Sequence, residues 1–211
     1  MSGAAMNKNV SISIAAILLL AACGSAPSQP PLSEAPLAGA AIGGDFTLTG
    51  QDGKKRSYAE FDGQYRIVYF GYTNCPDICT PDVQNLMAGL KAFEKTAPDL
   101  AKKIQPIFIT VDPQRDTPAV LKQFTSAFHR RLIGLTGTEA EIADAAKKFA
   151  VYYARVEGSQ PGAYLMSHSQ QPYLMGPDGK PLAILPADQP KTDANEGAPD
   201  LVSADLVKWV R

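Results

Sequence analysis

The residues best suited to carry out chemistry are two cysteines four positions apart, Cys75 and Cys79, in the stretch from Gly71 to Pro81. A thiolate binds soft metal ions and attacks disulfides, so the pair favours either metal binding or thiol–disulfide exchange. A local structural disulfide is a third interpretation, but a bridge that closes so short a loop adds little stability.

The spacing of the two cysteines differs from that of the thioredoxin-like reductases. Thioredoxin-like reductases use C-x-x-C, whereas here three residues separate Cys75 from Cys79. The extra residue lets both sulfurs face one point and still permits a bridge, since Cα atoms about 6 Å apart can be linked. The residues alone leave redox couple and metal clamp as alternatives.

Two histidines are available as further metal ligands, His129 and His168. His129 lies near the end of an expected helix, where a cationic side chain interacts favourably with the negative end of the helix dipole. His168 follows a turn-rich loop at 158–162 and precedes an expected strand. Its position alone is typical of an exposed loop histidine, so the third ligand stays open at this point.

The elements around the cysteines place them where a strand ends and a helix begins. Apolar, β-branched runs predict buried strands at 66–72 and 104–111. Between them we expect a helix with Thr80 as N-cap and Pro81 as its first residue, which makes a βαβ unit with parallel strands. Ligands bind at this edge of open α/β sheets, and a helix N-terminus stabilises thiolates, so we expect lowered thiol pKa values.

The rest of the domain follows the same reasoning. Turn signals and hydrophobic spacing predict a hairpin of 46–49 and 54–58, a helix at 117–128, a strand at 132–136, a helix at 138–149, a strand at 151–156, a hairpin of 171–175 and 181–185, and a helix at 203–210. Parallel strands first, an antiparallel hairpin later and a closing helix predict an α/β, thioredoxin-like fold. A central mixed sheet would be flanked by helices, with an N-terminal hairpin extension.

The N-terminus has the pattern of a lipoprotein signal. Lys8 precedes an apolar run at 10–20, which ends in Leu-Ala-Ala-Cys-Gly with the cysteine at position 23. We therefore predict a signal peptide over 1–22 and lipid attachment at Cys23, where several acyl chains would anchor the protein.

A linker and a folded domain are expected to follow the signal. Residues 23–41 are rich in Pro, Ser, Ala and Gly, which predicts a flexible tether, and 42–211 would form the folded domain. Lys and Arg number 20 against 21 Asp and Glu, which argues against a nucleic-acid partner, since such binders need a basic face.

Three separated motifs, in order, resemble the Sco/SenC family. They are the stretch from Phe70 to Pro81, the stretch from Thr110 to Pro118, and His168-Ser169 followed by Tyr173-Leu174 and Pro177-Asp178-Gly179. The resemblance implies that Cys75, Cys79 and His168 bind copper. Copper chemistry agrees, because Cu(I) favours thiolates and imidazole suits either oxidation state, whereas zinc would want a fourth ligand.

Two positions depart from the family pattern. Ser167 stands where the family often has an acidic residue before the histidine, and Gly176 stands where it often has Asp or Asn. The first departure removes a possible partner of the histidine and so bears on copper affinity and partner choice. Asp112 is retained, either as a turn and capping residue at a strand end or as a residue that supports the site or docks a partner.

The function implied by the resemblance is copper delivery to, or thiol preparation of, the dinuclear copper centre of cytochrome c oxidase. Subunit II of the oxidase, or another copper-accepting protein, would be the partner of a monomer anchored to the bacterial inner membrane and facing the periplasm. In the expected mechanism the loop bearing His168 moves while partner thiolates displace the ligands one at a time. The alternatives are a periplasmic thiol–disulfide oxidoreductase, which needs no His168, and a copper or redox sensor.

Overall fold

The chain was analysed as a computed structural model, in which residues 1, 29–75, 79–158, 163–188 and 195–211 are described. A seven-stranded mixed sheet runs through the domain in the order β2-β1-β5-β4-β3-β8-β9. Its strands are β1 (Thr47–Gly50), β2 (Lys55–Ser57), β3 (Tyr65–Gly71), β4 (Ile104–Thr110), β5 (Ile133–Thr136), β8 (Tyr173–Met175) and β9 (Pro181–Ile184). The thioredoxin-like sheet predicted from the sequence is confirmed, including the hairpin extension of β1 and β2.

The two central strands position the site. β3 and β4 are parallel, in register from Tyr65 opposite Ile104 to Gly71 opposite Thr110. Every residue of β3 is buried, because helices cover both faces of the sheet. The carboxyl ends of β3 and β4 therefore meet at one edge, as the βαβ pattern predicts.

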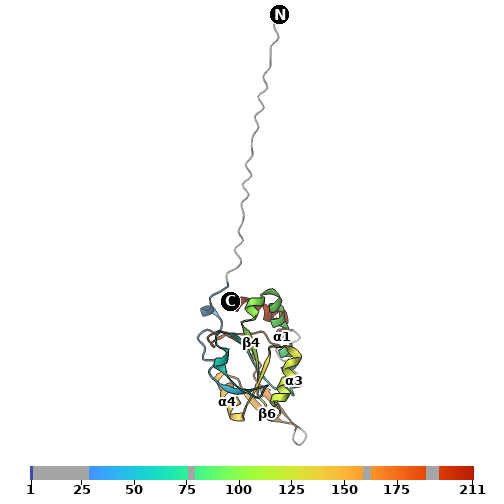
Figure 1. Cartoon of the computed structure of the whole chain (residues 1–211). Helices are drawn as coiled ribbons and strands as arrows, with labels where there is room; N and C mark the ends of the chain where they lie inside the picture. Colours follow the sequence, from blue (N-terminus) through green and yellow to red (C-terminus); the bar gives the residue numbers. More distant parts are fainter. Residues whose placement is uncertain (2–28, 76–78, 159–162, 189–194) are drawn as a thin grey trace.

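Helices form the outer layers of the domain. They are η1 (Leu32–Glu34), η2 (Tyr58–Phe61), α1 (Cys79–Thr96), α2 (Pro98–Ala101), α3 (Pro118–Phe128), α4 (Glu139–Lys148) and α5 (Pro199–Trp209). Figure 1 shows α1 and α3 on one side of the sheet and α4 on the other. On the α1 side Tyr69 packs on Phe108 with ring centroids 6.3 Å apart, and on the α4 side Phe70 packs on Phe149 at 5.5 Å.

Two predicted helix starts are wrong by a few residues. α1 begins at Cys79, so Thr80 and Pro81 lie in its first turn and Thr80 is not the N-cap. Proline is tolerated there because first-turn N–H groups have no partner within the helix. α5 begins at Pro199 rather than at 203, since a proline at the first helical position already has a helical φ angle.

The predicted tether is wrong for residues 29–41, which pack on the domain. Ala35 is 5% exposed, and the Leu37 N–H donates to the Leu182 carbonyl over 2.9 Å. The Gln29 amide also donates to the carbonyl of Val210 over 3.1 Å. The small and apolar side chains in this stretch find a surface to cover, which composition alone did not predict. The predicted signal peptide and Cys23 fall within residues 2–28, outside the described residues.

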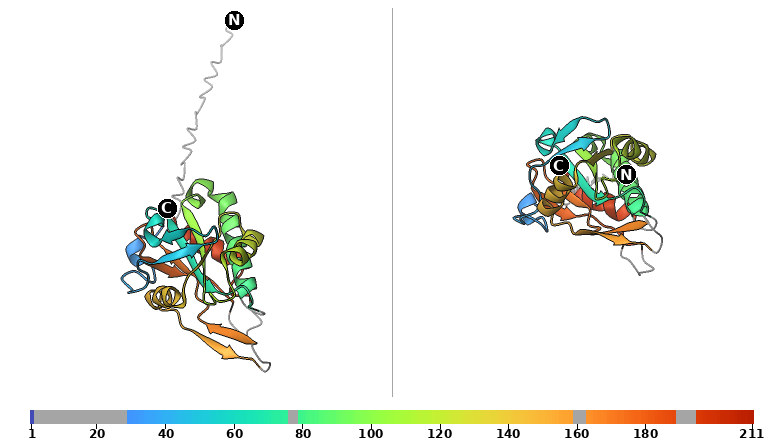
Figure 2. Two further views of the ribbon diagram at one scale, coloured as in Figure 1. Left: turned by 60° about the horizontal axis from the view of Figure 1, so that its bottom comes forward. Right: turned by 90° about the horizontal axis from the view of Figure 1, so that it is seen from below.

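A second, two-stranded sheet projects from the domain. β6 (Tyr153–Glu157) and β7 (Tyr164–His168) pair antiparallel, with Tyr153 opposite His168 and Glu157 opposite Tyr164. Figure 2 shows this ribbon extending from one end of the molecule. β7 was not predicted, and the expectation that His168 lies on a loop before a strand is wrong, because His168 is the last residue of β7.

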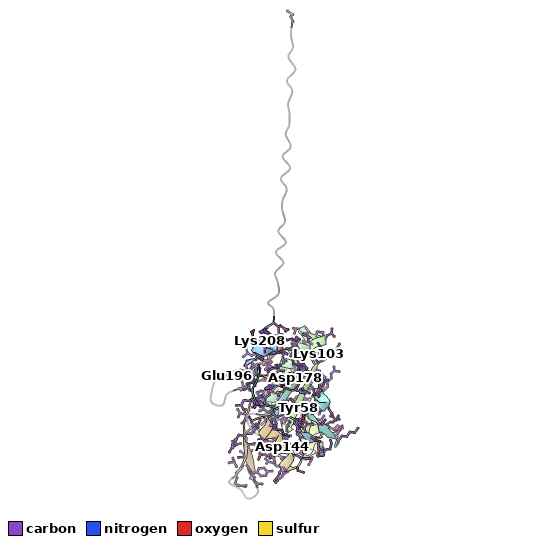
Figure 3. All side chains as sticks on the ribbon, turned by 90° about the vertical axis from the view of Figure 1, so that its left-hand side faces the viewer. Tyr58, Lys103, Asp144, Asp178, Glu196 and Lys208 are labelled. Carbon is purple, nitrogen blue, oxygen red and sulfur yellow. The ribbon has the colours of Figure 1, made fainter. Side chains whose placement is uncertain are left out.

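The two ends of the central sheet have different neighbours. At the amino end of β3, the Arg211 N–H donates to the Tyr65 hydroxyl over 3.2 Å, and the Arg211 guanidinium donates to the Pro30 carbonyl over 2.6 Å. Figure 3 places Lys103 and Lys208 at this end and Asp144 toward the other. The carboxyl ends of β3 and β4 and the ribbon lie away from both chain segments that meet there. Within the described residues, no helix is both long and apolar enough to span a bilayer.

Gly89 gives a test of the packing between α1 and α5. A Cβ at this position would lie 2.6 Å from the Val202 Cβ and 2.8 Å from the Pro199 carbonyl oxygen. Alanine normally stabilises a helix relative to glycine, but we expect Gly89→Ala to lower the free energy of unfolding by about 1–3 kcal/mol through overpacking. Urea unfolding measures the change, with Gln84→Ala on the exposed face of α1 as a control that stays near wild type. A stabilised Gly89→Ala variant would contradict this packing.

Candidate metal centre

The loop that follows β3 is anchored by a buried carboxylate. Asp116 accepts hydrogen bonds from the Thr73 N–H over 3.0 Å, the Thr73 hydroxyl over 2.6 Å and the Thr110 hydroxyl over 2.6 Å. Its side chain is fully buried, and this burial raises the pKa of Asp116 although the three hydrogen bonds act in the opposite direction. Asp116 thus fixes the chain between β3 and Cys75, a role that the sequence did not reveal.

The two cysteine side chains lie beside each other as thiols. Cys79 is fully buried, whereas Cys75 is partly exposed, and the Cys79 N–H donates to the Cys75 sulfur over 3.4 Å. Gly71 makes room for the buried thiol, because a Cβ there would lie 3.3 Å from the Cys79 sulfur and 2.9 Å from the Tyr69 ring. The end of β3 therefore has to be a glycine for Cys79 to occupy this position.

His168 reaches the cysteines from β7. Its Nε2 atom lies 3.0 Å from the Cys79 sulfur, and its Nδ1 atom lies 2.8 Å from the Ser169 carbonyl oxygen. Because a carbonyl can only accept, the hydrogen-bond network assigns the proton to Nδ1 and leaves the Nε2 lone pair directed at the thiols. One possible ligand atom from each of Cys75, Cys79 and His168 lies within 4.8 Å of the other two.

Aromatic rings enclose the histidine. The rings of Tyr69 and Tyr72 meet the imidazole edge to face, with centroids 6.4 Å and 5.9 Å away. Both tyrosines are buried, so they keep water from one side of the cluster and hold the imidazole plane. The site is thus walled on the protein side and accessible on the side of Cys75.

The buried thiol is poorly ionised without a metal. The neighbouring Cys75 sulfur and burial both raise the pKa of Cys79. The prediction that the helix N-terminus lowers the thiol pKa is therefore wrong for Cys79, because these two effects outweigh the helix dipole. A bound cation would take the place of the proton, so that metal binding and proton release are coupled here.

A second buried carboxyl group lies under the cluster. The Tyr69 hydroxyl donates to Asp82 over 2.8 Å, and Asp82 is 1% exposed. Burial raises the pKa of Asp82 to about 6, although the hydrogen bond from Tyr69 opposes the shift. Neither the position nor the state of Asp82 is visible in the sequence, where it reads as a first-turn acid of α1.

The other histidine stands apart from this cluster. His129 is the C-cap residue of α3, as its place near a helix end predicted, but its imidazole contacts Glu94 at 3.3 Å and accepts from the Arg131 N–H at 3.2 Å. Burial lowers the pKa of His129, which disfavours the cationic form expected from the helix dipole.

Asp112 forms the turn after β4 and also contacts the ribbon. Its carbonyl accepts from the N–H groups of Arg115 and Asp116, in agreement with the turn interpretation. Its carboxylate pairs with the Arg115 guanidinium and accepts from the Tyr164 hydroxyl over 2.8 Å. Asp112 is 3% exposed, so its carboxylate is committed to these internal partners.

The fold and the site together define a class of protein: a thioredoxin-fold protein with a dithiol and a histidine arranged to hold a soft metal ion. The fold is shared with the thioredoxin domain of a Bacteroides vulgatus thiol-disulfide oxidoreductase, at a TM-score of 0.54 and 16% identity over 81% of this chain and 96% of that one.

A match to a family profile assigns the chain to one family among the proteins that share this fold. The SCO1/SenC family profile matches residues 34–202, and the chain belongs to this family, as its motifs suggested.

Named relatives agree with the family assignment. The chain is 42% identical to the mouse mitochondrial Protein SCO2 homolog over 141 residues, which cover 66% of this chain and 54% of the relative. It is 42% identical to a SCO2-like protein of Rickettsia felis over 140 residues, 66% of each chain. The structure of Bradyrhizobium japonicum ScoI with copper bound is similar at a TM-score of 0.68 and 37% identity, over 80% of this chain and 99% of that one. The match spans about half the length of the mouse relative.

The state of Asp82 predicts a pH-dependent stability. Below about pH 3 the carboxyl is protonated in both the folded and the unfolded chain, so its burial has no ionisation cost. As the pH rises from the ordinary pKa of 3.8 to about 6, the unfolded chain ionises first and the folded protein loses stability. We expect the stability of wild type relative to Asp82→Asn to fall by about 2 kcal/mol between pH 4 and pH 7. Urea unfolding of both metal-free, reduced proteins across this range measures it, and a constant difference would contradict the raised pKa.

Proposed function

We propose that the protein binds one copper ion through the sulfurs of Cys75 and Cys79 and the Nε2 atom of His168. The observation that carries the proposal is the 3.0 Å approach of Nε2 to the Cys79 sulfur within a three-donor cluster no wider than 4.8 Å. Two thiolates and one imidazole form a soft donor set that suits copper, and Cu(I) in particular. The copper-bound ScoI of Bradyrhizobium japonicum supports the choice of metal.

The copper would be cargo that the protein delivers to the dinuclear copper centre of cytochrome c oxidase, on subunit II. A three-ligand site leaves the metal open to attack, and the partly exposed Cys75 marks the side from which acceptor thiolates can enter. Each incoming thiolate forms one copper–sulfur bond as one bond to this protein breaks. Since His168 ends a strand, the part that moves during transfer is the β6–β7 ribbon rather than a loop.

Thiol–disulfide exchange is a second candidate function, favoured by the contact between the cysteines. The N–H of Cys79 already meets the Cys75 sulfur at 3.4 Å, so the two side chains are close enough for a bridge to form with little movement of the chain. In this reaction the pair would give two electrons and two protons to a partner disulfide. The same step would prepare the acceptor cysteines for copper, and it requires no imidazole.

Copper titration tests the ligand set. We expect the reduced, full-length protein to bind one Cu(I), measured against a competing chelator. Cys75→Ser, Cys79→Ser and His168→Ala should each weaken binding by more than the roughly 10–100-fold that loss of an outer partner costs, because each removes a ligand. His129→Gln is the matched control and should keep wild-type affinity. Equal affinities of His168→Ala and wild type would exclude the histidine from the site.

We further propose that the chain is a monomer held by lipid at Cys23 on the periplasmic face of the inner membrane. Lys8, the apolar run at 10–20 and the cysteine that follows two alanines support this location. Lipid attachment would bring the domain close to a membrane-bound oxidase, which raises the rate of encounter without any new contact.

Labelling of cells with a radioactive fatty acid tests the anchor. The wild-type chain should take up the label and sediment with membranes, whereas Cys23→Ser should do neither, because the acylated sulfur is gone. Copper binding by purified Cys23→Ser should match wild type, which separates the anchor from the site. Unchanged labelling of the variant would show that the lipid is elsewhere or absent.

A further inference from the structure

Three side chains tie the ribbon to the main domain beside the metal ligands. Arg115 pairs with Asp112 through its Nε atom and donates from Nη1 to the Tyr164 carbonyl over 3.0 Å. The Tyr164 hydroxyl closes the ring by donating to the other oxygen of Asp112 over 2.8 Å. The Arg115 guanidinium also stacks on the Tyr164 ring, 3.7 Å from its centroid. The three residues therefore hold β7 through both its backbone and a side chain.

The group formed by Asp112, Arg115 and Tyr164 acts on the strand that carries His168. Tyr164 begins β7 and His168 ends it, so both side chains lie on the same face of the ribbon. At the other end of the strand, the Ser169 N–H donates to the Tyr152 carbonyl over 2.8 Å. Held at both ends, β7 keeps the imidazole beside the thiols for as long as these contacts last.

Arg115 also links this group of three residues to the metal ligands through Tyr72, which belongs to the main domain. The Arg115 guanidinium lies 5.7 Å from the centroid of Tyr72, and Tyr72 meets the His168 ring edge to face at 5.9 Å. Asp112 is 3% exposed, and a charge-assisted pair in such a position keeps its geometry better than an exposed pair does. The position of the ribbon is thus coupled to the residues around the copper ligands.

We propose that Asp112, Arg115 and Tyr164 form a latch that positions His168 for copper. The latch rests on the proposed copper site, and its members are positioning residues that touch no metal. With the latch closed, β7 keeps Nε2 within reach of the copper held by the two sulfurs. When the latch is broken, the ribbon swings more freely about its base, and copper is left to the thiols alone for part of the time.

Tyr164→Phe tests the latch with the least disturbance, because it removes only the hydroxyl and keeps the ring on which Arg115 stacks. We expect a 10–100-fold weaker Cu(I) affinity, the usual cost of losing a partner that orients a metal ligand. In the metal-free protein, we also expect faster hydrogen exchange of the β6 and β7 amides. Tyr153→Phe is the matched control, since its ring shares the ribbon face and its hydroxyl makes no hydrogen bond within the described residues.

The histidine itself provides the decisive comparison. If the latch acts through His168, Tyr164→Phe should cost no further copper affinity in a His168→Ala background. An equal loss in both backgrounds, or a Tyr164→Phe variant that matches Tyr153→Phe, would overturn the latch. If wild type fails to bind copper, the proposed function fails by itself. The exchange of the ribbon amides then still decides the latch, and unchanged exchange in Tyr164→Phe would overturn it.

Discussion

The contact between the Cys79 sulfur and the His168 imidazole is the constraint on which the site depends, because it joins residues 89 positions apart in the chain. The contact requires that the chain leaving the buried strand β3 place Cys79 at the start of α1. It also requires that β7 run from the outer end of the ribbon back toward the domain, so that His168 reaches the thiol. Neither side chain is placed by its own neighbours in sequence. The first turn of α1 supplies one partner, and a small ribbon outside the main sheet supplies the other.

The parts of the fold that follow from local patterns could be predicted from the sequence. The continuous apolar runs of β3 and β4 identify buried parallel strands, and the cysteines follow because the chain must leave the sheet there. His168 was found only through a family resemblance, since spacing carries no information on contacts between distant segments. β7 was missed because its five residues, Tyr-Leu-Met-Ser-His, show neither the apolar–polar alternation of a half-buried strand nor the continuous apolar run of a buried one.

The buried acidic residues show why the rest of the site could not be predicted from the sequence. Asp82, Asp112 and Asp116 follow the ordinary patterns of a helix start or a turn, and each of those patterns is normally exposed to solvent. What distinguishes them is burial against Tyr69, Tyr164 and Thr73, which only the tertiary structure provides. Residues 29–41 were misjudged for the same reason, because a few small apolar side chains suffice once a surface exists to receive them.

The chain enters the folded domain at the amino end of the central strands, where Pro30 meets Arg211, and it presents the thiols at the carboxyl end. β3 alone separates these poles by about 20 Å, at roughly 3.3 Å for each residue of a strand. Any support that holds the chain upstream of residue 29 would therefore hold the domain at the amino end of β3. The cysteines would then lie at the opposite end of the domain, facing away from the support.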